Sequence, residues 1–163
     1  MRLNLGCGDR YVEGWHNTDS GSPHRKDEQI DLCTPLPWHG VTHAYAGHVL
    51  EHLFIDGVIV LLQNLRGCMD HDGELMVVGP DVIVAQAMAT AGTLDVTMDS
   101  LTNGGHRWPG DEHRWHCTAQ AIEELLRVTG WSNVTQVGIE NVGEKWPVAD
   151  RRPRWQCAVS ARP

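Results

Sequence analysis

The stretch Leu3-Asn4-Leu5-Gly6-Cys7-Gly8, followed by the acid Asp19, decides the fold of this chain. A short apolar run that stops in closely spaced glycines predicts a strand and then a tight loop. The backbone N–H groups of such a loop can approach a ligand because no side chain intervenes. Asp19 ends a second predicted strand, residues 15–19, where a carboxylate suits a ribose diol. Because Gly-x-Gly alone is a weak motif, its meaning depends on the rest of the chain.

Length and composition indicate one globular domain, which we predict to span residues 1–163, with 41% hydrophobic and 21% charged residues. The net charge of −8 argues against a surface that coats nucleic acid, so we expect no nucleic-acid partner. The five scattered cysteines contain no Cys-x-x-Cys and fit a reducing cytosol. With no apolar run near the ~20 residues of a membrane span and a strand directly at the N-terminus, we expect a cytoplasmic protein without membrane segments.

Hydrophobic periodicity predicts strands that alternate with helices. The expected strands are residues 3–5, 15–19, 42–47, 75–78, 134–139 and 155–160, and the expected helices are 53–69, part of 81–102 and 118–129. Residues 20–29, 70–73 and 103–117 are expected to be loops or turns, and the first crossover is too short for a good helix. This order predicts an α/β fold with a mostly parallel sheet, and two successive final strands predict an antiparallel C-terminal edge strand.

Candidate ligand residues follow successive strands, and ligands of open α/β sheets bind beyond the carboxyl ends of the strands. The motifs in order are LNLGCG at 3–8, GWHNTD at 14–19, DLCTPLPW at 31–38, HVLEHL at 48–53 and GELMVVGPD at 73–81. Taken together they resemble the class I S-adenosylmethionine-dependent methyltransferases, in particular small Rossmann-like members. The likeness extends to residues 112–131 and so covers nearly the whole chain.

The resemblance implies a single methyltransferase domain that uses S-adenosylmethionine. It assigns the cofactor to Asn4, Gly6, Cys7, Gly8, Asp19, Asp31, Leu32, Gly47 and His48. In this assignment Asp19 takes the ribose hydroxyls, Asp31 accepts from the adenine amino group and Leu32 packs beside the ring. Many class I enzymes have an acid where this chain has Asn4, and the third glycine of the longer loop pattern is absent.

A methyl acceptor that is an oxygen or a protonated nitrogen benefits from a positioned base, most often histidine. His48 is the first candidate because it follows the fourth predicted strand, and His113 is the second. The tetrapeptide of DNA amino-methylating enzymes and the Pro-Cys nucleophile of cytosine-ring methylation are both absent. We therefore predict an oxygen or nitrogen acceptor on a small molecule, a glycan or an exposed protein group. A homodimer would complete an open acceptor site.

Two other functions are compatible with the sequence. One is a non-catalytic protein that keeps the methyltransferase fold for binding. The other is a zinc hydrolase, because His48-Val49-Leu50-Glu51-His52 matches a His-x-x-Glu-His metallopeptidase pattern. His113, His116 and Cys117 are also spaced for a metal, but they lack a second ligand pair, so the sequence predicts no metal site. The segment 106–116 is either a Trp-anchored ordered loop or a lid on the acceptor side.

Overall fold

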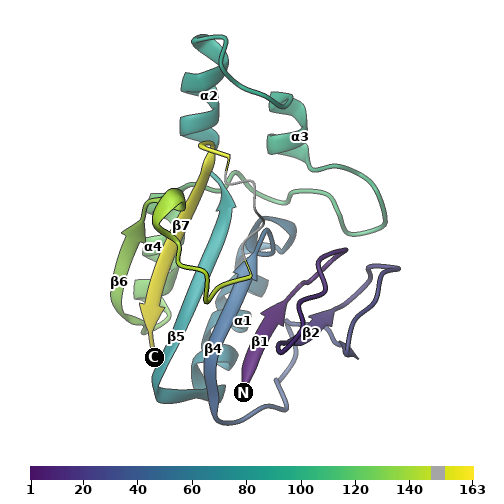
Figure 1. Cartoon of the computed structure of the whole chain (residues 1–163), viewed down its shortest axis with the longest axis vertical. Coiled ribbons are helices and arrows are strands. Elements are labelled where there is room, and N and C mark those ends of the chain that lie inside the picture. The colour runs from purple at the N-terminus through teal and green to yellow at the C-terminus, as the bar shows by residue number, and fades with distance from the viewer. Residues whose placement is uncertain (148–152) are drawn as a thin grey trace.

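The computed structural model describes residues 1–147 and 153–163, which fold around one sheet with strand order β3-β2-β1-β4-β5-β7-β6 (Figure 1). The strands are β1 (Arg2–Leu5), β2 (His16–Asp19), β3 (Glu28–Gln29), β4 (Val41–Gly47), β5 (Met69–Pro80), β6 (Ser132–Val137) and β7 (Gln156–Arg162). The α-helices are α1 (Ile55–Cys68), α2 (Val82–Thr90), α3 (Met98–Asn103) and α4 (Ala119–Val128). Two short 3-10 helices are η1 (Leu50–His52) and η2 (Ile139–Asn141).

The sheet is parallel from β3 to β5, and β7 runs antiparallel to both of its neighbours, β5 and β6. This is the expected Rossmann-like class I methyltransferase architecture in a single compact domain. The antiparallel C-terminal strand is confirmed, but it lies one place inside the edge, which β6 forms. The reason is that β5 is buried along most of its length and needs a hydrogen-bonded neighbour on each side, which β7 provides.

Both faces of the sheet are covered, which explains the uninterrupted apolar run of β5. Leu75 and Val77 pack into the cluster that contains the buried residues of α1 and α4. Met76 and Val78 point to the opposite face, because successive side chains of a strand alternate. There the cover is a second cluster that includes Trp146 of the segment after η2, while α1 and α4 lie behind the sheet in Figure 1.

Two predicted loops carry strand residues. Residues 70–73, expected to be a turn, lie within β5, and the register with β4 passes from Val41 opposite Met69 to His43 opposite Glu74. The additional residues of β5 form a bulge, so the sequence at 70–73, which predicts a turn, is accommodated inside the strand. β3 occupies Glu28–Gln29, within the expected loop 20–29, because two backbone pairings with β2 suffice for a strand of this length.

Capping residues fix where α4 and α2 begin. Thr118 caps α4 by accepting a hydrogen bond from the backbone N–H of Ala121, as its position predicts. Asp81 caps α2, and its second carboxylate oxygen accepts from the backbone N–H of Ala119 at 3.1 Å. One buried carboxylate therefore fixes the starts of two helices. In Figure 1, α2 and α3 lie beyond the carboxyl ends of β4 and β5.

The first crossover, residues 6–15, contains no helix and is held instead by the side chain of Asn17. Its Nδ2 donates to the carbonyls of Val12 and Trp15 and to the carboxylate of Asp27. Its Oδ1 accepts from Asn4 Nδ2 and from the backbone N–H of Val12, both at 2.9 Å. Asn17 is fully buried, so these bonds satisfy polar groups that water does not reach.

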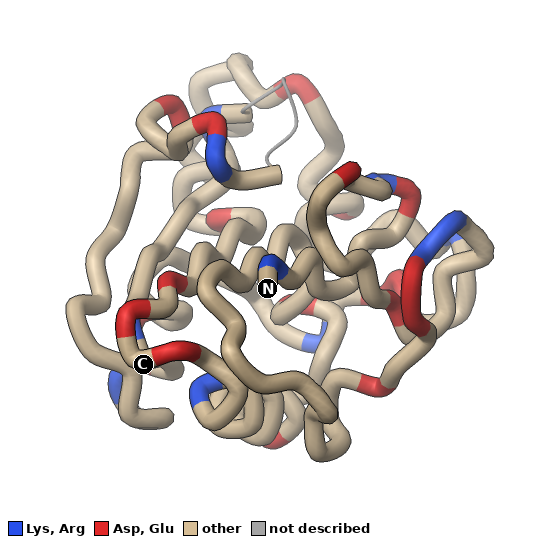
Figure 2. Tube along the Cα trace, turned by 60° about the horizontal axis from the view of Figure 1, so that its bottom comes forward, with Lys and Arg blue, Asp and Glu red and all other residues tan. Residues whose placement is uncertain are grey.

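The positions of the charged residues along the chain reflect the acidic composition. Among the described residues, Lys and Arg positions are scattered along the trace and are interleaved with more numerous acidic ones (Figure 2). In the same part of the chain, none of the helices combines the length and apolarity needed to cross a bilayer.

We predict that Asn17→Ala destabilises the fold more than any exposed asparagine substitution. The change leaves buried backbone groups of the first crossover without partners, at ~1–3 kcal/mol for each unsatisfied group. Urea unfolding should give a free energy of unfolding lower by about 2–4 kcal/mol. The control is Asn64→Ala, which removes a single exposed hydrogen bond to the carbonyl of Thr34. Equal effects of the two changes would contradict this role of Asn17.

Candidate cofactor and acceptor site

One cavity of about 590 Å³ lies at the carboxyl ends of the central parallel strands. All ten residues predicted for the site line it: Asn4, Gly6, Cys7, Gly8, Asp19, Asp31, Leu32, Gly47, His48 and His113. They come from the ends of β1, β2 and β4, from the segment after β3 and from the loop after α3. The volume falls within the ~300–1,000 Å³ of ordinary small-molecule sites.

The glycine loop after β1 is shaped by two glycines in the left-handed region, Gly6 with φ 55° and Gly8 with φ 54°. A Cβ on Gly6 would lie 2.7 Å from Cγ2 of Val49, so the backbone is pressed against the start of the η1 segment. A Cβ on Gly8 would meet nothing within 4 Å, so Gly8 faces open space in the cavity. The loop therefore exposes backbone on its ligand side and packs tightly on the other.

Asp19 joins the glycine loop to the segment after β2. Its Oδ2 accepts from the backbone N–H of Gly8 at 2.9 Å, and its Oδ1 accepts from those of Gly21 and Ser22 at 2.9 and 2.7 Å. A carboxylate offers about four acceptor positions, so Asp19 keeps capacity for ligand hydroxyls. The half-buried carboxylate thus both shapes the loop and faces the cavity.

Asn4 and Cys7 have structural reasons for their identities. The buried Asn4 donates from Nδ2 to the Arg10 carbonyl and to Asn17 Oδ1, so an acid there would face two acceptors. This network gives a structural reason for the amide of Asn4. Burial and the nearby Asp19 raise the pKa of Cys7 to about 11, so its thiol stays protonated at neutral pH.

The opposite wall is formed by Asp31 and Leu32, after β3. Asp31 is exposed, and its Oδ1 accepts from the backbone N–H of Cys33 at 2.9 Å. Leu32 is buried and presents an apolar surface to the same cavity. This wall pairs an acceptor carboxylate with an apolar side chain, a combination that suits an aminated aromatic ring.

His48 occupies a strained position directly after β4. Its φ of 58° is unusual for a residue with a Cβ and costs about 1–2 kcal/mol. Its Nδ1 lies 2.9 Å from Glu51 Oε1, and its Nε2 lies 2.6 Å from Nε2 of Gln156. Because the carboxylate accepts, Nδ1 carries the proton and Nε2 keeps the lone pair, which receives the amide N–H of Gln156. In the neutral imidazole, these two contacts hold His48 in one tautomer.

The partner of His48 is a fully enclosed carboxylate. Glu51 is 1% exposed, and burial by itself opposes its ionisation. The hydrogen bond from His48 and the charges of His48 and His52 outweigh burial and hold the pKa of Glu51 below its ordinary value. Its second oxygen, Oε2, has no hydrogen-bond partner within the described part of the chain.

A further wall of the cavity is formed by α3 and the loop 104–117. Arg107 pairs with the buried Asp111 through two 3.0 Å contacts, so its guanidinium serves the loop rather than an anionic ligand. Trp115 anchors the loop by donating from Nε1 to the Leu50 carbonyl at 2.8 Å. The predicted Trp-anchored loop is thus observed, and its Arg107 and Trp108 line the cavity, while its role as a lid on the acceptor side stays a prediction.

His113, the second candidate base, has different surroundings from His48. Its Nδ1 lies 3.0 Å from the carbonyl of Leu101, and its ring meets that of His52 edge to face at 4.8 Å. Burial lowers its pKa, more than the nearby Glu51 raises it. Among the described residues, a direct ion pair with a carboxylate is found for His48 and not for His113.

The zinc-hydrolase hypothesis required His48 and His52 on one helical face, and this expectation is wrong. His48 precedes η1 in a left-handed conformation, and both of its ring nitrogens already have partners. Sequence reasoning also missed Gln156 and Tyr45, which line the cavity. Gln156 comes from the last strand, and no local motif marks its approach to His48. Tyr45 sits beneath Gly47, and burial raises its pKa to about 12.

Comparison with known proteins supports the fold. No protein-family model and no curated protein matches the sequence. Among solved structures, a SAM-dependent methyltransferase from Archaeoglobus fulgidus is 14% identical with a TM-score of 0.62, over 99% of this chain and 85% of that one. A DhpI–SAH complex is 15% identical with a TM-score of 0.63, over 99% and 76%.

Other similar structures are longer. Human N-acetylserotonin methyltransferase in complex with SAM is 14% identical with a TM-score of 0.59, over 99% of this chain and 46% of that one. The chain likewise spans 49% of the S-adenosylmethionine-dependent methyltransferase SibL. The chain thus corresponds to about half of these longer proteins, and at such identities the likeness establishes the fold alone.

The two glycines of the loop should respond differently to alanine. Both substitutions impose left-handed strain of about 1–2 kcal/mol, but Gly6→Ala also drives its Cβ into Val49. We therefore expect Gly6→Ala to lower the thermal midpoint clearly more than Gly8→Ala. Differential scanning calorimetry of both variants tests this. A larger loss in Gly8→Ala would show that the packing of the loop differs from this description.

Proposed function

We propose that the cavity binds S-adenosylmethionine and that the protein transfers its methyl group to an oxygen or nitrogen acceptor. The observation that carries this proposal is the convergence of all ten sequence-predicted residues on one cavity at the carboxyl ends of β1, β2 and β4. Ligands of open α/β sheets bind at this edge. The similar structures described with SAM or SAH support the same ligand class.

The residues present fit this ligand from end to end. The exposed backbone at Gly8 leaves room for close approach of the methionine part. Asp19 offers spare acceptor capacity to the ribose hydroxyls, while Asp31 and Leu32 suit the amino group and the face of the adenine. Gly47 keeps the end of β4 free of a side chain, because a Cβ there would collide with Tyr45.

When bound, S-adenosylmethionine supplies an electrophilic methyl carbon on a sulfonium. The protein then has to align the acceptor atom with that carbon and to receive a proton. The bound group would supply the methyl carbon to which the acceptor lone pair forms its new bond, and its sulfur would keep the electrons of the carbon–sulfur bond that breaks. His48 Nε2 takes the acceptor proton, and the Glu51 carboxylate at Nδ1 stabilises the imidazolium that results.

Gln156 controls access to this base. Its amide donates to the same Nε2 lone pair that must receive the proton, so an acceptor O–H has to displace it. A protein in which this displacement never occurs would bind the cofactor without catalysis, which is the alternative function of a non-catalytic binding protein.

We expect the affinity for S-adenosylmethionine to depend strongly on the carboxylates of Asp19 and Asp31. Asp19→Ala and Asp31→Ala should each weaken S-adenosylmethionine binding roughly 10- to 100-fold, the loss of a charge-assisted hydrogen bond of about 1.5–3 kcal/mol. The control is Asp72→Ala, an exposed acid paired with His71 in the bulge of β5. Isothermal titration calorimetry measures all three. Absence of binding by the wild-type protein at millimolar ligand would refute the proposal.

The base should affect turnover and not cofactor affinity. His48→Ala should lower kcat about 10²–10⁴-fold, the usual contribution of a general base, with cofactor affinity unchanged within about 3-fold. His71→Ala, an exposed histidine, is the matched control. The measurement is transfer of labelled methyl groups in a panel of hydroxylated and aminated metabolites, glycans and proteins. Unchanged transfer by His48→Ala would remove His48 from the mechanism.

A further inference from the structure

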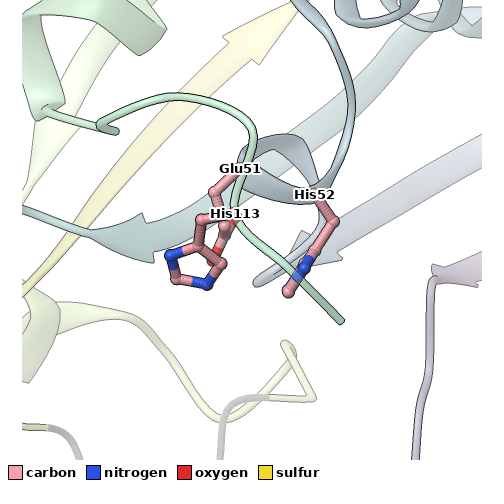
Figure 3. A group of neighbouring side chains, drawn as sticks. All are labelled: Glu51, His52 and His113. Atoms are coloured by element: carbon pink, nitrogen blue, oxygen red, sulfur yellow. The ribbon is translucent and has the colours of Figure 1, made fainter. Parts of the chain in front are cut away.

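Three potential metal ligands meet in the wall of the cavity beside His48. Glu51 and His52 come from η1, and His113 reaches them from the loop 104–117 (Figure 3). One ligand atom of each side chain lies within 4.8 Å of the other two. His52 and His113 line the cavity, whereas Glu51 lies behind them. The cluster thus has an enclosed carboxylate at its base and two imidazoles at its mouth.

The hydrogen bonds of both histidines leave the same ring nitrogen available. Nδ1 of His113 lies 3.0 Å from the carbonyl of Leu101, and Nδ1 of His52 lies 3.3 Å from the carbonyl of Glu112. A backbone carbonyl only accepts, so each Nδ1 carries the proton and each Nε2 keeps its lone pair. Protein metal sites orient their histidine ligands in this way, with the second nitrogen bonded to a carbonyl or a carboxylate.

The carboxylate supplies an independent observation. Oε1 of Glu51 is used by His48, but Oε2 is buried without a hydrogen-bond partner in the described residues. Leaving a buried carboxylate oxygen unpaired is costly, and such groups are normally paired or bound to a metal. A cation between this oxygen and the two imidazoles would remove the deficit.

The backbone holds these groups together without help from the cluster itself. The N–H of Arg114 donates to the carbonyl of Glu51 at 2.7 Å, and Trp115 Nε1 donates to that of Leu50 at 2.8 Å. These bonds fasten the loop to η1 directly after His113. The site is therefore preformed, and an ion has only to draw the side chains from their present spacing to the roughly 3.3 Å that bonds of ~2.0–2.1 Å require.

We infer that Glu51 Oε2, His52 Nε2 and His113 Nε2 form a binding site for one divalent transition-metal ion such as zinc. Two imidazoles and a single carboxylate favour such an ion over Mg²⁺ or Ca²⁺, which take mainly oxygen ligands. Three protein ligands leave a coordination position open, and the ligands at the cavity wall direct it toward the cavity. The sequence alone predicts no metal site, because His113 is far from Glu51 and His52 in the sequence and only the folded course of the loop 104–117 brings it to η1.

A consequence for catalysis follows, and it rests on the proposed function. The Glu51 carboxylate joins the ion to the base, with Oε1 on His48 and Oε2 in the ligand set. The open position suits an oxygen of the acceptor, which the ion would hold beside His48. The acceptor class that this arrangement favours is a hydroxyl compound with an oxygen able to bind the ion.

The first test is metal binding by the chelator-treated full chain in the absence of S-adenosylmethionine. Calorimetric titration with Zn²⁺ should give one equivalent, and Co²⁺ should give the visible absorption of nitrogen and oxygen ligation. His113→Ala and His52→Ala should each weaken Zn²⁺ binding at least about 10- to 100-fold. The matched control is His116→Ala, an exposed histidine of the same loop outside the cluster, which should bind as the wild type does.

Absence of stoichiometric Zn²⁺ binding by the wild type, or equal loss in His116→Ala and His113→Ala, would overturn the metal site. Circular dichroism establishes that each variant is folded, and if His113→Ala is not, His52→Ala carries the comparison. The same preparations are titrated with S-adenosylmethionine. Cofactor binding without zinc binding refutes the metal site alone, whereas zinc binding without cofactor binding refutes the proposed function alone.

Discussion

The carboxylate of Glu51 is enclosed by protein, so its oxygens need polar partners to offset the cost of removing them from water. One oxygen is satisfied by His48, which fixes the tautomer of the candidate base and favours its protonated form during proton transfer. The backbone around Glu51 is tied to the loop that carries His113. The candidate base therefore contacts the side chain of Glu51, and the loop that carries His113 is hydrogen-bonded to the backbone of the same residue.

A second carboxylate, that of Asp19, organises the part of the cavity proposed for the cofactor, and it is less buried than Glu51. Asp19 is only half-buried, and it collects three backbone N–H groups while keeping capacity for a ligand. Together with Asn17, it replaces the helix that a longer first crossover would supply.

The parts of the fold that are encoded locally could be predicted from the sequence. The glycine loop and His48 each follow a strand whose apolar pattern is visible, Asp19 ends the predicted strand 15–19, and parallel strands bring their ends together. The strand before Asp31, β3, is polar and lies in a segment expected to be a loop. The place of β7 inside the edge and the bulge at residues 70–73 depend on pairing between distant segments. The approach of Gln156 to His48 and of His113 to Glu51 also depends on contacts between segments far apart in the chain. No hydrophobic periodicity in the sequence predicts such contacts.

The central claim is that this cavity is a cofactor site, and a crystal structure of the protein grown with S-adenosylhomocysteine tests it most directly. The account predicts the ligand along the carboxyl ends of β1, β2 and β4, with ribose hydroxyls on Asp19, the adenine amino group at Asp31 and the sulfur toward His48. A ligand bound elsewhere, or in this cavity with its adenine toward His48, would contradict the account.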